Sequence, residues 1–534
     1  AIVFRLIGTD DVKVDVVSLL GKMALGNNDK ECIARKGGKV LVNMLSSNLE
    51  GQTASLLALH NLSNLDDNAA ILVDLGAVPA LINILFKHPR DEPSNLKELA
   101  ASTMANIVSK SGHWELASAD KQGNRMQSEL IIHGLLELLR LSSAKCQLAV
   151  LQTLHGIASS PQATDLAATN VRSGNGVATI IPFLEHSESE TRIYAFRLVS
   201  LLSEKLGQFL ADELIASNKL LLLKEKLLDA QSPNEKSEVA ATLANLPIPP
   251  EVVKTTLGSD LLRWVVSSLR EHRSHSSRNS RHTTRMVEGL LGILLHFARS
   301  SDPVILSAAC ENQLLAVFRE RLSSRSPRER QRAALGLKYL SESASTLTSA
   351  REVELQPGGF CGPFLFMCGK SSMPPVLCPI HCAVCEDNNS FCLLKGNSVK
   401  PLIDLMNDEN TQVQIAAVEA LSTLLSDAQN LKNATEELDE LGLFDTATDL
   451  FKKVRPGDLQ ERLIWMIERL STVDALVQAY STDQGLVTAL IGALKHGNPN
   501  TRSHAQDALT NLRQLSGVGG RNSNHGRARR RTSH

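Results

Sequence analysis

The sequence is poor in aromatic residues, in net charge and in long apolar runs. Aromatic residues make up only 4% of the 534 residues, although hydrophobic residues reach 43%. A core built mainly of Leu and Ala suits thin stacked helices better than a sandwich or a barrel. The formal net charge is −1, so no overall field attracts nucleic acid or an anionic membrane. No apolar run has the length needed to span a bilayer, and we expect no transmembrane segment.

Motifs of common enzymes are also missing from the sequence. It has no Gly-rich phosphate loop followed by Lys and Ser/Thr, no dinucleotide fingerprint, no His-Glu-x-x-His and no Gly-x-Ser-x-Gly. The basic stretches Arg270–Arg285 and Arg527–Arg531 lack the interleaved aromatics that stack on bases. We interpret them as a flexible loop and a solvated tail; a phosphorylation-controlled loop and a nuclear-localisation or anionic-surface patch are the alternatives. We therefore predict no catalytic site in this chain and no nucleic-acid partner.

What the sequence does have is a recurring helix signature. It reads Leu-x-Asn-Leu or a near relative, and a small residue often stands four places before its first position, which we call the anchor. The steps between successive anchors are 39, 45, 50, 44, 45, 47, 47, 84, 46 and 42 residues. A period in the forties is typical of armadillo and HEAT repeats. The anchors are Leu20, Leu59, Met104, Leu154, Leu198, Leu243, Leu290, Leu337, Leu421, Ile467 and Leu509.

One repeat illustrates the pattern. Val399–Met406 is a short apolar helix, residues 407–410 form a polar turn with capping residues, and Thr411–Leu425 carries apolar residues at helical spacing. A single repeat cannot bury both of its apolar faces, so each repeat must stack on the next. We predict an all-α, armadillo-type, right-handed superhelical solenoid of about eleven helical repeats. The expected divisions are repeats in 1–350, a Cys-rich insert in 351–395, repeats in 396–516 and a disordered basic tail in 517–534.

The residue two places after the anchor is the predicted partner-binding position. In an armadillo array it lies on the third helix of the repeat and faces the groove, where a side-chain amide can both donate and accept hydrogen bonds. The simpler interpretation is an Asn tolerated at a half-exposed helix site. Asn recurs only irregularly there, which disfavours nuclear-import cargo recognition and leaves a groove for an unspecified protein ligand. The predicted groove residues are Asn61, Asn106, Asn245, Tyr339, Arg469 and Asn511.

The 84-residue step contains six of the nine cysteines. Cys378-x-x-His381 and Cys382-x-x-Cys385 are spacings that can chelate one tetrahedral Zn²⁺, although the two pairs overlap, and Cys392 follows them. The predicted ligands are Cys378, His381, Cys385 and Cys392. The alternative is a loop that binds no metal, in which some thiols are packed against other residues and others are free. Catalytic use of the thiols is disfavoured, because only His381 lies close to them in the sequence. The remaining cysteines, together with the lack of a secretion signal, favour a reducing compartment.

The segments that flank the insert carry a family resemblance. Arg332–Glu342 reads Arg-Ala-Ala-Leu-Gly-Leu-Lys-Tyr-Leu-Ser-Glu, and Phe391–Ile403 reads Phe-Cys-Leu-Leu-Lys-Gly-Asn-Ser-Val-Lys-Pro-Leu-Ile. With the Cys/His-bearing segment between them, this order resembles the armadillo region of plant U-box E3 ubiquitin ligases, over about residues 1–515. The resemblance implies that the repeats select a substrate or adaptor protein, while a U-box N-terminal to them binds the E2 enzyme.

No U-box is recognisable in residues 1–534, and the chain lacks an initiator Met, so we expect a fragment or truncated product of such a ligase. The alternative is a stand-alone armadillo scaffold or adaptor without ligase activity. The resemblance and the composition together predict a cytoplasmic location, with peripheral plasma-membrane association or a nuclear location as alternatives.

Overall fold

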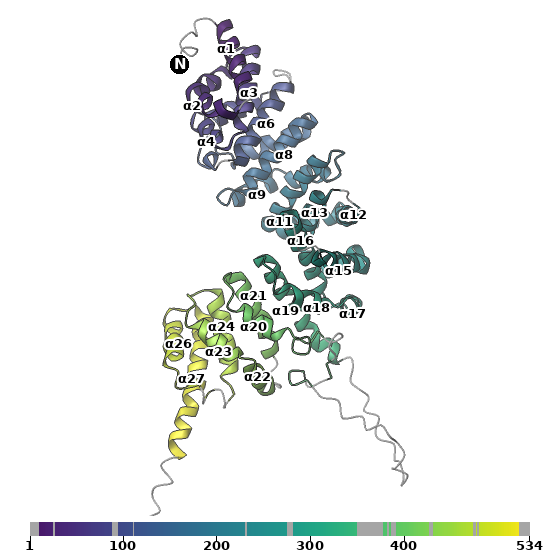
Figure 1. Ribbon diagram of the computed structural model, residues 1–534, viewed down its shortest axis with the longest axis vertical. Helices are drawn as coiled ribbons and strands as arrows, with labels where there is room; N and C mark the ends of the chain where they lie inside the picture. Colours follow the sequence, from purple (N-terminus) through teal and green to yellow (C-terminus); the bar gives the residue numbers. More distant parts are fainter. Residues whose placement is uncertain are drawn as a thin grey trace, which may run out of the picture. The chain divides into compact units, whose positions relative to one another are not determined.

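The computed structural model describes residues 10–24, 27–87, 94–110, 112–229, 232–274, 281–349, 378–381, 384–385, 391–426, 431–473, 477 and 480–522. The described residues are 79% helical and contain no strand. It divides into two compact units, residues 1–248 and 249–534, which we call unit 1 and unit 2. The predicted all-α armadillo-type solenoid is confirmed, and Figure 1 shows the helices of each unit stacked in sequence order.

Unit 1 is built around six helices that carry the first six anchors, which we call its third helices. Each packs on the next, and the helices between them pack against the third helices next to them. The third helices are α1 (Asp10–Met23), α3 (Leu49–Ser63), α6 (Ser94–Lys110), α8 (Ala144–Ser159), the first part of α11 (Ser189–Ala216) and α13 (Pro233–Asn245). The other elements are α2 (Asn27–Met44), α4 (Asp66–Asp74), α5 (Ala77–Leu85), η2 (His113–Glu115), α7 (Glu129–Leu141), α9 (Thr164–Ser173), α10 (Gly176–Ile180), η3 (Ile181–Glu185) and α12 (Lys219–Asp229).

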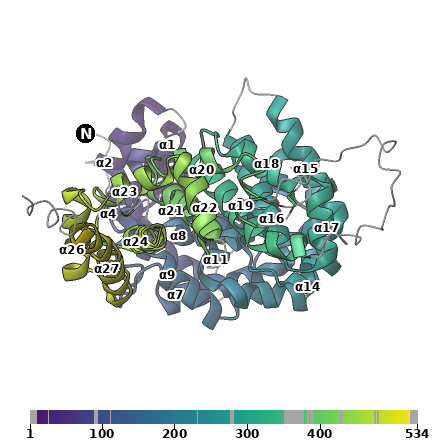
Figure 2. The same cartoon turned by 90° about the horizontal axis from the view of Figure 1, so that it is seen from below.

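Unit 2 repeats the plan with the last five anchors (Figures 1 and 2). Its third helices are α16 (Arg281–Ala298), α19 (Pro327–Ser349), α21 (Thr411–Ser422) continued by η5 (Thr423–Leu425), α24 (Asp458–Leu470) and α27 (Pro499–Asn522). The other elements are α14 (Pro250–Val252), η4 (Val253–Leu257), α15 (Gly258–Ser274), α17 (Pro303–Glu311), α18 (Leu314–Arg321), α20 (Val399–Leu405), α22 (Leu431–Glu440), α23 (Leu443–Phe451) and α26 (Gln484–His496).

Burial of the anchors explains why the signature recurs. All eleven lie on third helices, and none exposes more than 7% of its surface. The small residues four places earlier, such as Ala333 and Ala417, are fully buried, so neighbouring third helices approach closely. A buried Leu contributes about 1.5–3 kcal/mol relative to an exposed one, so the repeated anchor stabilises each contact between third helices.

Helix ends follow the capping signals in the sequence. The Asn410 side chain accepts hydrogen bonds from the backbone of Gln412 and Val413 and starts α21. Ser326 accepts from the backbone N–H of Glu329 at 3.4 Å, directly before α19 begins at Pro327. Within α11 the helix bends at Gly207, whose φ of 41° is outside the helical range and easily adopted only by glycine. The polar turn predicted at residues 407–410 thus ends in the residue that caps α21.

The 84-residue step does not interrupt the stack, because α19 packs directly on α21. Most of the Cys-rich insert, including Cys361, Cys368 and Cys382, lies outside the described residues, as do residues 275–280 of the Arg-rich loop. At the C-terminus α27 continues to Asn522, so the first residues of the predicted tail are helical, and 523–534 are not described.

No single helix in the described part of the chain is long and apolar enough to cross a membrane. Among the described helices, one bent pair passes by length and composition, α4 and α5, whose axes are bent by 85°.

Candidate functional site

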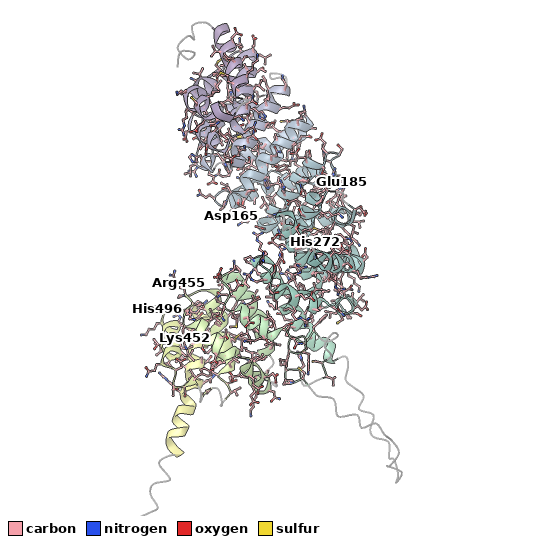
Figure 3. The ribbon with its side chains drawn as sticks, in the orientation of Figure 1. Asp165, Glu185, His272, Lys452, Arg455 and His496 are labelled. Carbon is pink, nitrogen blue, oxygen red and sulfur yellow. The ribbon has the colours of Figure 1, made fainter. Side chains whose placement is uncertain are left out.

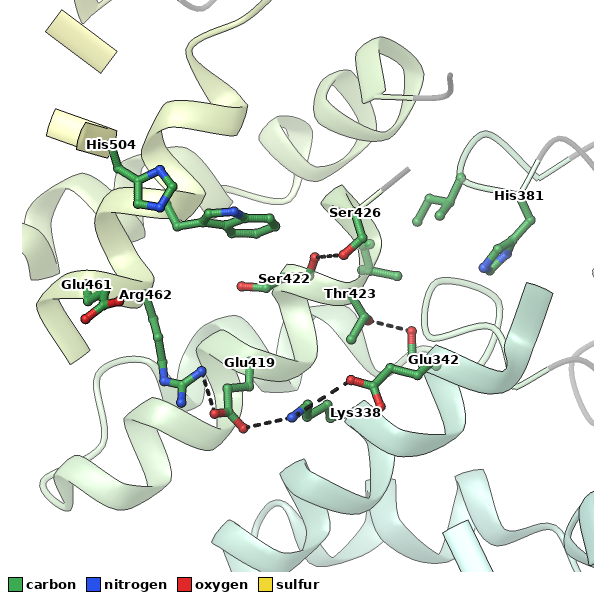
Figure 4. Close-up of a pocket in the computed structure, with 14 residues that line it drawn as sticks. Lys338, Glu342, His381, Glu419, Ser422, Thr423, Ser426, Glu461, Arg462 and His504 are labelled. Atoms are coloured by element: carbon green, nitrogen blue, oxygen red, sulfur yellow. Dashed lines mark hydrogen bonds and ion pairs between the residues drawn. The ribbon is translucent and has the colours of Figure 1, made fainter. Parts of the chain in front are cut away.

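A groove of about 700 Å³ opens along the third helices of unit 2 (Figure 4), and we call it the third-helix groove. Four successive third helices line it, and a short piece of the insert adds Ile380 and His381. The lining residues from α19 are Lys338, Ser341 and Glu342, and those from α21, η5 and the turn that follows are Glu419, Ser422, Thr423, Leu424 and Ser426. Glu461, Arg462 and Trp465 come from α24, and His504 comes from α27.

A ladder of charges crosses the groove from one repeat to the next. The Glu419 carboxylate pairs with Lys338 Nζ of the preceding repeat at 3.4 Å and with an Arg462 guanidinium nitrogen of the following repeat at 2.6 Å. Lys338 also lies 3.8 Å from Glu342, which is half exposed. Figure 4 shows these side chains in line across three helices. Because Glu342 and Arg462 keep 49% and 44% of their side chains exposed, both signs of charge remain accessible to a ligand.

Apolar and hydrogen-bonding groups lie beside this ladder. Trp465 is half-buried on α24, and the Arg469 guanidinium carbon lies 5.9 Å from its ring centroid. His504 Nδ1 lies 2.6 Å from a Glu468 carboxylate oxygen. Hydrogen bonds from Asn498 and Asn500 hold the pKa of the Glu461 carboxyl below its ordinary value, so it stays ionised at neutral pH. The groove therefore combines an aromatic surface with fixed positive and negative groups.

The predicted Asn residues all donate to the repeat before their own. The side-chain N–H groups of Asn61 and Asn106 donate to Gly21 O at 3.1 Å and to Ser63 Oγ at 3.0 Å. Asn245 and Asn511 donate to the hydroxyls of Ser200 and Ser471 at 3.4 and 3.3 Å, respectively. These bonds tie successive third helices together, and partner binding by the same amides stays a prediction.

The other two predicted groove residues make similar contacts between repeats. Arg469 donates to the carbonyl oxygens of Leu425 and Ser426 at the end of the preceding third helix, at 3.0–3.3 Å. The Tyr339 ring lies under the Arg299 guanidinium, 4.7 Å from centroid to Cζ. None of the six residues is among those that line the third-helix groove, and their role in binding stays a prediction.

The groove residues that were not predicted from the sequence include Lys338, Glu419, Arg462, Trp465 and His504. They stand at positions −5, −2 and +1 relative to the anchors, spaced three residues apart, so they share one face of the third helix. The prediction considered only position +2, and these residues lie at other positions on the third helix. The signal that could have found them is the alignment of charged and aromatic residues at −5, −2 and +1 over consecutive repeats.

The Cys/His cluster lies at the end of this groove. The ligand atoms of Cys378, His381, Cys385 and Cys392 all lie within 4.8 Å of one another, an arrangement that could hold a metal ion. Burial lowers the pKa of His381, but contacts with the thiols of Cys378 and Cys385 outweigh it and raise that pKa to about 9. Hydrogen bonds from Cys385 and Cys392 lower the pKa of the Cys378 thiol, while donation to Cys378 raises that of Cys392.

The comparisons with known proteins agree with this architecture. No family model matches the chain. The chain is 28% identical over 526 residues to U-box domain-containing protein 43 of Arabidopsis thaliana, and 27% identical over 534 residues to U-box domain-containing protein 24 of Oryza sativa subsp. japonica. The alignments cover 96% and 95% of this chain, respectively, but the chain spans only 64% of the length of either relative.

Solved structures show the same fold. An engineered protein matches with a TM-score of 0.57 at 18% identity, covering 89% of this chain and 98% of the other. A structure from work on a phosphorylation switch in the cadherin–β-catenin interaction matches with a TM-score of 0.57 at 16% identity, covering 96% and 89%. Both are armadillo-repeat proteins. By sequence this chain is similar to plant U-box domain-containing proteins along nearly its whole length, as predicted, and by structure it is an armadillo-type solenoid.

Proposed function

We propose that this chain is the partner-binding armadillo region of a U-box-type ubiquitin-protein ligase. The observation that carries the proposal is the third-helix groove, where a charge ladder and Trp465 lie on consecutive third helices of a chain whose relatives are U-box domain-containing proteins. In the whole protein a U-box would bind the ubiquitin-charged E2 enzyme. The repeats would hold the substrate or adaptor close to it. A cytoplasmic location, with peripheral association at the plasma membrane, is part of the same proposal.

The groove has the chemistry to bind a protein segment in an extended or helical conformation. Arg462 offers a guanidinium to acidic side chains or backbone carbonyls, and Glu342 accepts from basic side chains or backbone N–H groups. Trp465 offers a flat apolar surface, and Trp and Arg are enriched among the residues that dominate interface energies. Contacts spread over several repeats give many modest contributions, with the largest expected at Trp465 and Arg462.

The test compares two Arg→Glu variants in the full-length protein. Arg462→Glu should replace the more exposed cation of the groove with a carboxylate, while Arg455→Glu changes an exposed residue of unit 2 outside the groove (Figure 3). Ubiquitin-remnant peptides are quantified by mass spectrometry in cells that express each variant. We expect Arg462→Glu to lose ubiquitination of partner proteins at least tenfold while self-ubiquitination persists, and Arg455→Glu to retain both.

The scaffold alternative has a separate test. The reading frame upstream of Ala1 is expected to encode a U-box. A frame without one would refute the ligase role and favour an adaptor that binds partners without modifying them. Equal loss of partner ubiquitination in both Arg variants would instead refute the assignment of the groove.

A further inference from the structure

We propose that Cys378, His381, Cys385 and Cys392 bind one Zn²⁺ as a closed, structural Cys₃His site. The site lies outside the ligase chemistry and does not depend on the proposed function. It would fix the end of the insert against the third-helix groove.

The separations between ligand atoms fit a tetrahedral zinc site. Cys378 Sγ lies 3.8 Å from Cys392 Sγ and 3.7 Å from His381 Nδ1, and Cys385 Sγ lies 3.3 Å from His381 Nδ1. Bonds of about 2.3 Å to sulfur and about 2.0–2.1 Å to nitrogen give tetrahedral edges of about 3.8 Å for S···S and about 3.6 Å for S···N. The 3.8 Å between Cys378 Sγ and Cys392 Sγ is well above the about 2.05 Å of a disulfide bond, and the three cysteines are free.

The ligand types indicate which metal and which role. Three thiolates and one imidazole are soft and borderline ligands that select zinc over magnesium or calcium. Four protein ligands occupy all four coordination positions of a tetrahedral zinc ion, so no position is left for water or substrate. Cys378 and Cys392 expose only 1% and 2% of their surface, which suits a closed site. The inferred role is therefore structural.

The turn that follows Cys392 supports the site and attaches it to the repeat stack. The Lys395 backbone N–H lies 3.5 Å from Cys392 Sγ, a contact that would stabilise a thiolate ligand. Gly396 N–H donates to Cys392 O at 2.8 Å, and Arg319 of α18 donates to Gly396 O at 2.9 Å. A Cβ at position 396 would lie 2.3 Å from Leu315 Cδ2 and 3.0 Å from Cys392 O, so a larger residue there would have to displace the Leu315 side chain.

The position of the site gives the metal a consequence for the groove. His381 uses Nδ1 in the cluster, and the same residue, with its neighbour Ile380, lines the groove (Figure 4). Residues 350–377 separate α19 from the cluster in the sequence. Zinc binding would stabilise the segment that carries Ile380 and His381 beside the third-helix groove, because the free energy of metal binding adds to the stability of the folded segment.

The experiment measures zinc in the purified full chain under reducing conditions, by mass spectrometry of the metal. We expect one zinc per chain in the unaltered protein, and less than a tenth of that in Cys378→Ser and in Cys392→Ser. Two matched variants should keep the zinc: Cys32→Ser, at an exposed cysteine of unit 1, and Cys382→Ser, at the cysteine of the insert next to His381. Cobalt added to the metal-free protein should give the absorption of a tetrahedral thiolate complex.

A second measurement separates metal loss from misfolding. Chelator treatment of the unaltered protein should raise hydrogen exchange in residues 378–398 while the amides of α21 stay protected, and added zinc should reverse the change. Substoichiometric zinc in the reduced unaltered protein would overturn the proposal. So would zinc retained in both Cys378→Ser and Cys392→Ser, or zinc lost in Cys382→Ser but kept in Cys385→Ser.

Discussion

Two junctions between third helices show how little the chain connection matters to the stack. In unit 1, Arg192 of α11 binds Glu235 of α13 through two hydrogen bonds of 2.7 and 2.8 Å, 43 residues away in the sequence. In unit 2, Arg330 of α19 binds Asp408, directly before α21, at 2.7 and 3.0 Å, 78 residues away. We call these the ordinary and the interrupted junction.

The two junctions also share hydrogen bonds from the arginine to backbone carbonyl oxygens. At the ordinary junction Arg192 also donates to the carbonyls of the residues six and five positions before it, and at the interrupted junction Arg330 does the same. The same arginine–carboxylate bridge thus occurs at both junctions, although the chain between α19 and α21 contains an insert about as long as one repeat. The packing of third helices sets the geometry, and the connecting chain adapts to it.

The largest effect expected is from proline in a third helix. Leu421→Pro at the interrupted junction and Leu198→Pro at the ordinary one each remove a helical hydrogen bond and a fully buried side chain. Each should cost about 3 kcal/mol or more and break the stacking on both sides. Circular dichroism melts measure the loss, and Leu421→Met, which conserves volume, should cost less than about 1.5 kcal/mol. A cooperative melt with full helicity in Leu421→Pro would contradict the shared geometry.

The sequence predicted this part of the molecule well, because the signal is local. Leu421 and Ala417 repeat at helical spacing, and Asn410 is a capping residue next to them, so helix type and helix start can be predicted without tertiary contacts. The groove was harder to predict. Glu419 acquires its role only when Lys338 and Arg462 are brought to it from neighbouring repeats. The Asn donors show the same limit, since the sequence gives the amide at Asn106 but not that Ser63 lies beside it.

Loss of the arginine bridge should have the next largest effect. Arg192→Ala and Arg330→Ala each leave a buried carboxylate without its partner: the side chains of Glu235 and Asp408 are only 3% and 7% exposed, respectively. We expect about 2–3 kcal/mol of destabilisation in both variants. Hydrogen exchange of α13 and α21 amides measures the two junctions separately. Losses that differ by more than about 1 kcal/mol would show that the insert contributes to the interrupted junction.

Lowering the pH should weaken both junctions. At moderately acidic pH we expect a smaller loss of stability than in either Arg→Ala variant. Arg192 lowers the pKa of Glu235 below its ordinary 4.5; burial alone would raise the pKa of Asp408, but Arg330 and the Asn410 N–H hold it below 3.8. Because these pKa values are lower in the folded state, the unfolded chain binds more protons in acid. The stabilisation is therefore complete above about pH 4.5 and lost as pH falls through the folded values. Melts between pH 3 and 7 should show a flatter acid limb in the double variant Arg192→Ala/Arg330→Ala.

Replacing the insert should have the smallest effect, and it tests most directly whether the ordinary and the interrupted junction are equivalent. Residues 351–377 can be replaced by a Gly/Ser linker of equal length, which keeps the reach of the connection and removes its sequence. Since α19 and α21 already pack directly, and the entropy of closing a loop depends only weakly on what fills it, the melting temperature should change by less than about 2 °C. The cluster at Cys378–Cys392 remains in this variant, so its zinc content should not change. A larger fall in melting temperature, with loss of protection in α21, would mean that the replaced residues help to hold the interrupted junction. The equivalence of the two junctions would then fail, and the Arg330–Asp408 bridge would be insufficient without the insert.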